Sequence, residues 1–176
     1  MSSPATSQVL ARWNALAAEE AAAEILPCCG SREWARALTS ERPFATADAL
    51  FSTSDRIWSA LSESEWREAF RSHPRIGQQH AQAATAQSLA WSRDEQRAAV
   101  MPDDAVKLAL AEANRHYEER FGHIFIVCAA GKSAAEILAL LNARMQNDAA
   151  TELLQAAEQQ RQITQLRLRR WLGDNP

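Results

Sequence analysis

Alanine is the residue that most constrains how this chain can fold. It occupies 36 of the 176 positions, whereas only 5 residues are glycine and 6 are proline. Alanine has the highest helix propensity, and folds built from many strands need glycine and proline at their turns. With 47% hydrophobic and 23% charged residues, the composition is that of a globular protein rather than of a disordered chain. We therefore predict an all-α fold in a single compact domain that covers residues 1–176.

Hydrophobic periodicity predicts roughly eight helices and one short extended segment. Residues 123–128 are rich in β-branched side chains, but this stretch is too short to form a sheet alone. Residues 73–90 lack periodicity and are predicted to be a loop with one weak helical turn, and residues 1–9 and 173–176 to be poorly ordered tails. The helices are expected at about 17–26, 31–41, 47–60, 62–70, 92–100, 103–121, 133–145 and 149–172.

Charge and cysteine usage limit the classes of partner and compartment. The formal net charge of -3 argues against a protein whose whole surface binds nucleic acid. The three cysteines, Cys28, Cys29 and Cys128, are odd in number and form no CxxC pair, which is typical of a reducing compartment. The longest apolar run, 124–130, is far shorter than the roughly 20 residues of a membrane span, and no secretory signal is visible. We expect a cytoplasmic protein.

Two candidate site residues lie at predicted helix ends. His73 follows the helix that ends near Phe70 and precedes Pro74, which keeps the backbone before it extended. Its imidazole suits proton transfer near neutral pH, but a histidine at a helix C-terminus is also favoured by the helix dipole. Glu95 completes a capping box with Ser92, so it either caps its own helix or accepts hydrogen bonds from a ligand at that helix N-terminus. The pattern leaves both interpretations open for each residue.

Arg167 is the candidate that the hydrophobic pattern itself indicates. At about 100° per residue it falls inside the apolar arc of the last helix, whereas Arg169 and Arg170 point away. A guanidinium on an apolar face must be paired, because an unpaired buried charge costs several kcal/mol. Its partner is either a core carboxylate or a substrate carboxylate, unless its stem carries the charge outward. The arc consists of Leu153, Ala156, Ala157, Ile163, Leu168 and Trp171.

No metal or phosphate site is expected. Glu112 and His116 are spaced to share a metal, but no second such pair accompanies them. Gly131-Lys132-Ser133 lacks the upstream glycine of a phosphate-binding loop. These absences disfavour a metal-dependent helical hydrolase, one of two rival interpretations. The other is a non-catalytic helical regulator or scaffold, which would give no reason for an arginine on an apolar arc.

Several short motifs, in this order along the chain, resemble the 2-oxo-4-hydroxy-4-carboxy-5-ureidoimidazoline (OHCU) decarboxylases of urate breakdown. The resemblance covers about residues 10–172. One departure is His123-Ile124, where the family usually has Phe-Pro. The motifs are Leu26-Pro27-Cys28-Cys29-Gly30, Arg42-Pro43-Phe44, Ala69-Phe70-x-x-His73-Pro74-Arg75-Ile76-Gly77, Ser92-x-x-Glu95-Gln96, Tyr117-x-x-Arg120-Phe121-Gly122 followed by Phe125-Ile126-Val127-Cys128-Ala129, and Leu166-Arg167-Leu168.

The resemblance implies which residues form the site. His73 matches the catalytic histidine, Glu95 its acidic partner and Arg167 the essential arginine of the family. The extended segment would line the active site and read the polar edge of a small heterocycle with unpaired backbone groups. The substrate-binding residues implied are Pro74, Ser92, Arg93, Asp94, Glu95, Gln96, Phe125, Ile126, Val127, Cys128 and Ala129.

The resemblance also implies a reaction, the decarboxylation of OHCU to (S)-allantoin and CO2. Arg167 would bind the substrate carboxylate, Glu95 would accept the ring and ureido N–H groups, and His73 would donate a proton. Because the substrate carries its own electron sink, a C=N bond, no cofactor and no metal are expected. The expected partner is this small-molecule substrate, with no nucleic acid and no membrane, and the expected assembly is a homodimer.

Overall fold

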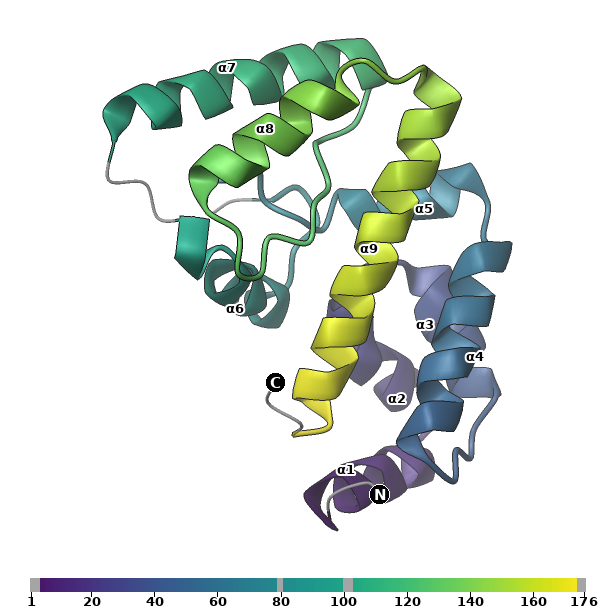
Figure 1. Ribbon diagram of the computed structural model, residues 1–176. Helices are drawn as coiled ribbons and strands as arrows, with labels where there is room; N and C mark the ends of the chain where they lie inside the picture. The colour runs from purple at the N-terminus through teal and green to yellow at the C-terminus, as the bar shows by residue number, and fades with distance from the viewer. Residues whose placement is uncertain (1–3, 79–80, 100–102, 174–176) are drawn as a thin grey trace. The chain divides into compact units, whose positions relative to one another are not determined.

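The computed structural model describes residues 4–78, 81–99 and 103–173, and within these ranges all regular secondary structure is helical (Figure 1). This confirms the all-α fold class. The described residues form nine α-helices and two short 3-10 helices, without any strand. In chain order they are α1 (Pro4–Ala15), α2 (Ala18–Ile25), η1 (Leu26–Cys28), α3 (Arg32–Ser40), α4 (Ala47–Ala60), α5 (Glu63–Phe70), α6 (Ala86–Glu95), η2 (Arg97–Ala99), α7 (Asp104–Phe121), α8 (Ala134–Arg144) and α9 (Ala149–Trp171). No described helix is both long and apolar enough to cross a membrane.

The contacts divide the chain into two compact units. The terminal unit consists of Met1–Ala69 and Arg161–Pro176, and the central unit of Phe70–Gln160. The first half of α9 therefore belongs to the central unit and the second half to the terminal unit. We describe each unit by itself.

In the terminal unit, α3 packs between α2 and α4. The Ser31 side chain accepts from the backbone N–H of Trp34 at the start of α3, and Thr46 caps α4 in the same way. These caps fix where each helix begins, and so which face it turns inward. The Trp34 indole is fully buried and donates to the Ser54 hydroxyl at 3.2 Å.

Helix α1 was not expected, because residues 1–9 were predicted to form a tail. Its end is held by tertiary contacts rather than by a strong local pattern. The indole of Trp13 donates to the Ala21 carbonyl at 2.9 Å and stacks on Phe44, with ring centroids 6.2 Å apart. Such long-range contacts are invisible to hydrophobic periodicity. The outer parts of both predicted tails, 1–3 and 174–176, lie outside the described residues.

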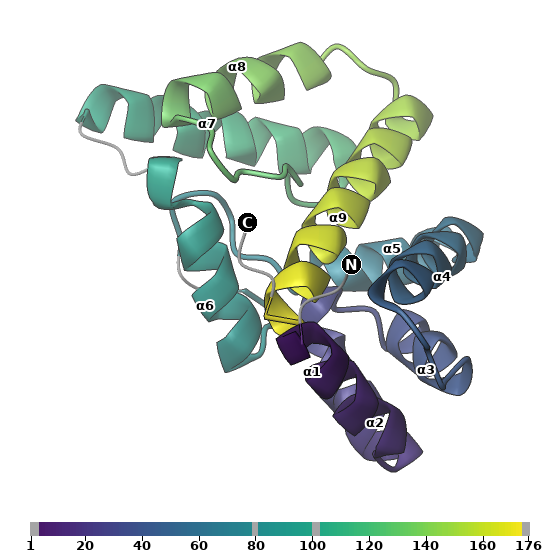
Figure 2. The ribbon, with the colours of Figure 1, turned by 60° about the horizontal axis from the view of Figure 1, so that its bottom comes forward.

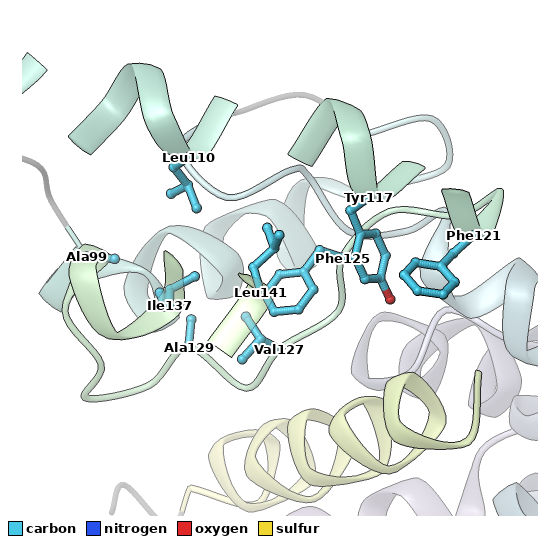
Figure 3. Close-up of a cluster of buried hydrophobic side chains, with 9 residues drawn as sticks. All are labelled: Ala99, Leu110, Tyr117, Phe121, Phe125, Val127, Ala129, Ile137 and Leu141. Carbon is cyan, nitrogen blue, oxygen red and sulfur yellow. The ribbon is translucent and has the colours of Figure 1, made fainter. Parts of the chain in front are cut away.

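The central unit is built on the packing of α7 against α8, which lie side by side (Figure 1 and Figure 2). Gly122 ends α7 in the left-handed conformation at φ 73°, which suits glycine, and the chain then runs extended through 124–129. This confirms the one predicted extended segment. Every second residue of it faces the same apolar cluster, as the pleat of an extended chain requires (Figure 3). The cluster consists of Ala99, Leu110, Tyr117, Phe121, Phe125, Val127, Ala129, Ile137 and Leu141.

Candidate functional site

His73 lies just beyond α5, as predicted. Its backbone N–H donates to the Phe70 carbonyl at 3.1 Å, closing a turn after the helix. The residue is only 8% exposed, and its Nε2 lies 2.6 Å from Oε1 of Gln160 on α9. A role confined to the helix dipole does not require such a bond. The geometry therefore favours a histidine whose ring orientation matters.

Glu95 ends a helix rather than beginning one. The hydroxyl of Thr85 caps α6 by accepting from the backbone N–H of Ser88, and α6 then runs on to Glu95. The predicted capping box of Ser92 and Glu95 is therefore wrong, as is the predicted loop over residues 86–90. The buried residues of α6 are Ser88, Ser92 and Glu95. Because this buried face is polar, the helix lacks the apolar stripe by which helices are predicted.

A hydrogen bond ties the loop after His73 to the end of α6. The backbone N–H of Gly77 donates to Oε1 of Gln96 at 3.0 Å, and Gln96 directly follows Glu95. The structure thus brings together the segments that contain His73 and Glu95, which are 22 positions apart in the sequence. Both belong to the central unit.

The two charged residues between Ser92 and Glu95 lie on the opposite face of α6. Arg93 and Asp94 are exposed, and the Asp94 carboxylate pairs with Arg97 at 2.7 Å. Ser92 and Glu95 are three residues apart and therefore share the buried face. The structure gives Ser92 and Glu95 the environment of a site and gives Arg93 and Asp94 the environment of a solvated surface.

The extended segment is buried, and side chains bind part of its backbone. Arg144 donates from Nη1 to the Ile126 carbonyl at 2.7 Å. The Cys128 N–H donates to Oε1 of Gln159 at 2.9 Å, and the Cys128 carbonyl accepts from Nζ of Lys132 at 2.8 Å. The expectation that this backbone is unpaired is thus wrong for these three groups and for the Ala129 carbonyl, which accepts from the backbone N–H of Lys132 at 3.0 Å. Their bonds fix the segment in place.

Behind this segment lies a buried charge cluster that the sequence analysis missed. Glu152 is fully buried and accepts hydrogen bonds from the Tyr117 hydroxyl, from Arg144 and from Nδ2 of Asn147. Burial and the adjacent carboxylate raise the pKa of Tyr117. Since Arg144 also holds the Ile126 carbonyl, the cluster links α7, α8 and α9 to the extended segment.

His123 takes an aromatic position at the entry to the segment. Its ring packs against Phe70, Tyr117 and Phe121, with centroid distances of 5.2, 5.6 and 6.4 Å. An imidazole thus fills a place among aromatic rings where the resembling family usually has phenylalanine. The departure from the family pattern is accommodated by packing.

Arg167 belongs to the terminal unit and is 0% exposed, as its place on the apolar arc predicted. Its Nη1 donates to the Pro27 carbonyl at 3.2 Å. Neighbouring Cys29 is also fully buried, and burial raises the pKa of its thiol to about 12, partly offset by the Arg167 charge. The guanidinium thus helps to order the Leu26–Cys28 turn of its own unit.

Metal-binding geometry is not found in the part of the chain that the structure describes, since no three His, Cys, Asp or Glu side chains gather there. Glu112 and His116 instead form a surface cluster with Arg115, which donates to both. The three cysteines are buried thiols without a disulfide.

Comparison with known proteins gives one family. The model of the OHCU decarboxylase family matches residues 14–169. The uric acid degradation bifunctional protein TTL of Arabidopsis thaliana is 35% identical over 148 residues, which is 84% of this chain and 46% of that protein. The OHCU decarboxylase of Amia calva is 28% identical, and the aligned region covers 76% of this chain and 77% of that protein.

Solved structures agree with the family match. A crystal structure of OHCU decarboxylase in the presence of (S)-allantoin has a TM-score of 0.74 and 34% identity, and the match covers 85% of this chain and 96% of that one. The chain spans less than half of the bifunctional relatives, 46% of the Arabidopsis protein and 24% of one from Bacillus sp.. The family match nevertheless runs through nearly all of the described residues of both units. The chain belongs to the OHCU decarboxylase family.

Proposed function

We propose that this protein decarboxylates OHCU to (S)-allantoin and CO2 in urate degradation. Family membership supports this, as does the likeness to a decarboxylase crystallised with (S)-allantoin. The observation that carries the proposal is the hydrogen bond from Gly77, in the loop after His73, to the side chain of Gln96 directly after α6. His73 and Glu95, a buried imidazole and a buried carboxylate, lie in the two segments that this bond ties together.

The proposed reaction uses the C=N bond of the substrate as its electron sink, in place of a cofactor. The bond between the ring carbon and the carboxylate breaks, CO2 leaves, and the electron pair forms a C=C bond to the imine carbon while the C=N electrons move to the ring nitrogen. A proton then adds to one face of the former imine carbon and sets the S configuration, and the hydroxyl of the decarboxylated carbon becomes a carbonyl as its proton moves to the ring nitrogen. The protein must orient the carboxylate, stabilise the enolate-like intermediate and deliver that proton.

Three side chains would divide these tasks. Arg167 would bind the substrate carboxylate, because a guanidinium fork matches it with two parallel hydrogen bonds. Glu95 would accept from the ring and ureido N–H groups, since an ionised carboxylate is an acceptor only. His73 would deliver the proton, as imidazole titrates near neutral pH.

The lining of the site follows from burial. Ser92 lies on the buried face of α6 with Glu95, half-buried Gln96 follows Glu95 directly, and buried Pro74 follows His73. Backbone groups of Phe125, Ile126 and Val127 other than the Ile126 carbonyl would bind the ring. Arg93 and Asp94 are left out of this proposal, because both are exposed.

The direct test mixes pure protein with freshly prepared OHCU and follows optical rotation. Accumulation of (S)-allantoin faster than in the protein-free control supports the proposal. Decay at the control rate to a racemic product would refute it. Dialysis against a chelator should leave the rate unchanged, and restoration of a lost rate by zinc or manganese would indicate a metal enzyme instead.

We also propose a compartment, an assembly and a domain organisation. Three cysteines without a disulfide are consistent with a reducing, cytoplasmic environment. The family match across residues 14–169 supports treating both units as one domain. A homodimer is proposed as the assembly, and sedimentation equilibrium should give twice the 19.5 kDa chain mass.

A further inference from the structure

Gln160 is a buried amide for which neither the hydrophobic pattern nor the family resemblance gives a role. It is 0% exposed and lies on α9 between the apolar residues Ala157 and Ile163. Burying an amide among apolar side chains costs free energy unless its polar atoms are hydrogen-bonded. Its Oε1 lies 2.6 Å from Nε2 of His73. The partner of this costly group is thus the candidate proton donor.

The chemistry of this contact fixes a tautomer. An amide oxygen can only accept a hydrogen bond, so the Nε2 of His73 must carry the hydrogen. In the neutral ring the second nitrogen, Nδ1, then holds the lone pair, and protonation changes occur there. The bond therefore determines which nitrogen titrates, as well as the direction of the ring.

The contact with Gln160 acts on the ring of His73, whereas two other hydrogen bonds hold the backbone of its loop. The backbone of its loop is bound at both ends, by the bond from His73 N–H to Phe70 and by the bond from Gly77 to Gln96. The side chain still has two rotatable bonds, and Gln160 restrains them from a long helix. Orientation of this kind is worth much in catalysis, because a displacement of about 1 Å can lower a rate by about 10²-fold.

We propose that Gln160 is a positioning residue that holds the His73 ring and keeps its proton on Nε2. Its catalytic consequence rests on the proposed decarboxylation, whereas the tautomer does not. The two can therefore be tested separately. Gln160→Met keeps the length of the side chain and removes the amide oxygen. Gln160→Glu keeps an acceptor at the same place, and Gln155→Met is the matched control, since Gln155 lies on the exposed face of the same helix.

The first measurement needs no substrate. In ¹⁵N-histidine protein, with the His73 signals assigned by their loss in His73→Asn, the wild type should show a protonated Nε2 and a titrating Nδ1. Gln160→Met should show a mixture of tautomers, while Gln160→Glu should keep the Nε2 proton and raise the His73 pKa through its negative charge. Gln155→Met should match the wild type. Unchanged ¹⁵N shifts in Gln160→Met would overturn the inference whether or not the protein is a decarboxylase.

The second measurement is turnover of OHCU. Gln160→Met should lower kcat by roughly 10²-fold with KM nearly unchanged, because it disturbs the orientation of the proton donor rather than binding. Gln160→Glu should recover most of kcat with its optimum moved to higher pH. A wild type that turns over OHCU and a Gln160→Met variant of equal kcat would overturn the catalytic role. A wild type without turnover would refute the proposed function and leave the tautomer result standing.

Discussion

Removing Glu152 tests whether the buried charge cluster holds the extended segment. In Glu152→Leu, Arg144 loses its carboxylate partner while its side chain stays about 9% exposed, and Tyr117 and Asn147 lose their acceptor. Breaking a buried ion pair by removing one partner typically costs about 3–5 kcal/mol. We expect the free energy of unfolding to fall by about that amount.

The double variant Arg144→Met with Glu152→Leu separates charge from packing. Replacing both partners by apolar side chains is often nearly neutral, so most of the loss should be recovered. The Ile126 carbonyl then lacks its Arg144 donor, which should leave a deficit of about 1–3 kcal/mol. Chemical denaturation of the wild type, both single variants and the double variant, followed by circular dichroism, gives the coupling energy.

Binding supplies the second readout of the same variants. If the Arg144 bond positions the segment, the double variant should bind (S)-allantoin more weakly than the wild type although it is more stable than Glu152→Leu. If the free energy of unfolding of Glu152→Leu is less than about 1 kcal/mol below that of the wild type, the ion pair of Arg144 and Glu152 is not desolvated. Unchanged affinity in the double variant would show that the cluster serves stability alone.

Three further predictions concern His73, Arg167 and pH. His73→Asn cannot titrate, so turnover should fall by roughly 10²-fold or more with stability retained, and a destabilised variant of normal specific activity would make His73 structural. Arg167→Lys loses the planar fork and the Nη1 bond to Pro27, so turnover should fall. Because (S)-allantoin lacks the carboxylate, it should bind to this variant nearly as it binds to the wild type. Weakened binding of allantoin would refute the assignment of Arg167 to the substrate carboxylate. Because the Cys29 thiol has a pKa raised to about 12, its contribution to stability is complete below about pH 8.5 and is lost as pH rises, by up to about 1.4 kcal/mol per pH unit. Cys29→Ala should flatten that slope in denaturant midpoints between about pH 8.5 and 11, and an unchanged slope would contradict the burial argument.

Helices with an apolar stripe were predictable, and α6 shows where that signal fails. The predicted helices over 47–60, 103–121 and 149–172 agree with α4, α7 and α9 to within one or two residues. α6 buries Ser88, Ser92 and Glu95, so its sequence looks like a loop. A polar buried face has no hydrophobic periodicity, and only tertiary partners make such a helix stable.

The capping-box error has a related cause. A serine followed three residues later by a glutamate matches the motif at Ser62, Ser92 and Ser133. The structure has a capping box at Ser133 and none at Ser92, because Thr85 has already begun that helix. A four-residue pattern cannot tell the first turn of a helix from its last when both ends lack apolar markers. Glu95 remains a candidate site residue, since it is buried at the end of the helix.

Helix α9 buries other polar residues besides Arg167. The fully or nearly fully buried polar residues of α9 are Glu152, Gln160, Thr164 and Arg167. Glu152 and Gln160 are about two turns apart; Gln160 falls inside the arc and Glu152 at its edge. A polar residue on the apolar side of a helix needs a specific partner. Hydrophobic periodicity identifies such a residue but not its partner.

The partners distinguish what these buried groups do. Three side chains donate hydrogen bonds to Glu152. Removing its carboxylate should therefore lower the free energy of unfolding, as in any buried ion-pair cluster. Gln160 binds the ring of His73, a residue that a solely structural helix end would not need to orient. Since an apolar residue at position 160 would spare the cost of burying an amide, its presence requires a compensating gain. In Gln160→Met that gain should be lost as kcat, while the free energy of unfolding falls by no more than about 1–3 kcal/mol, the cost of removing the Gln160 acceptor from the His73 N–H.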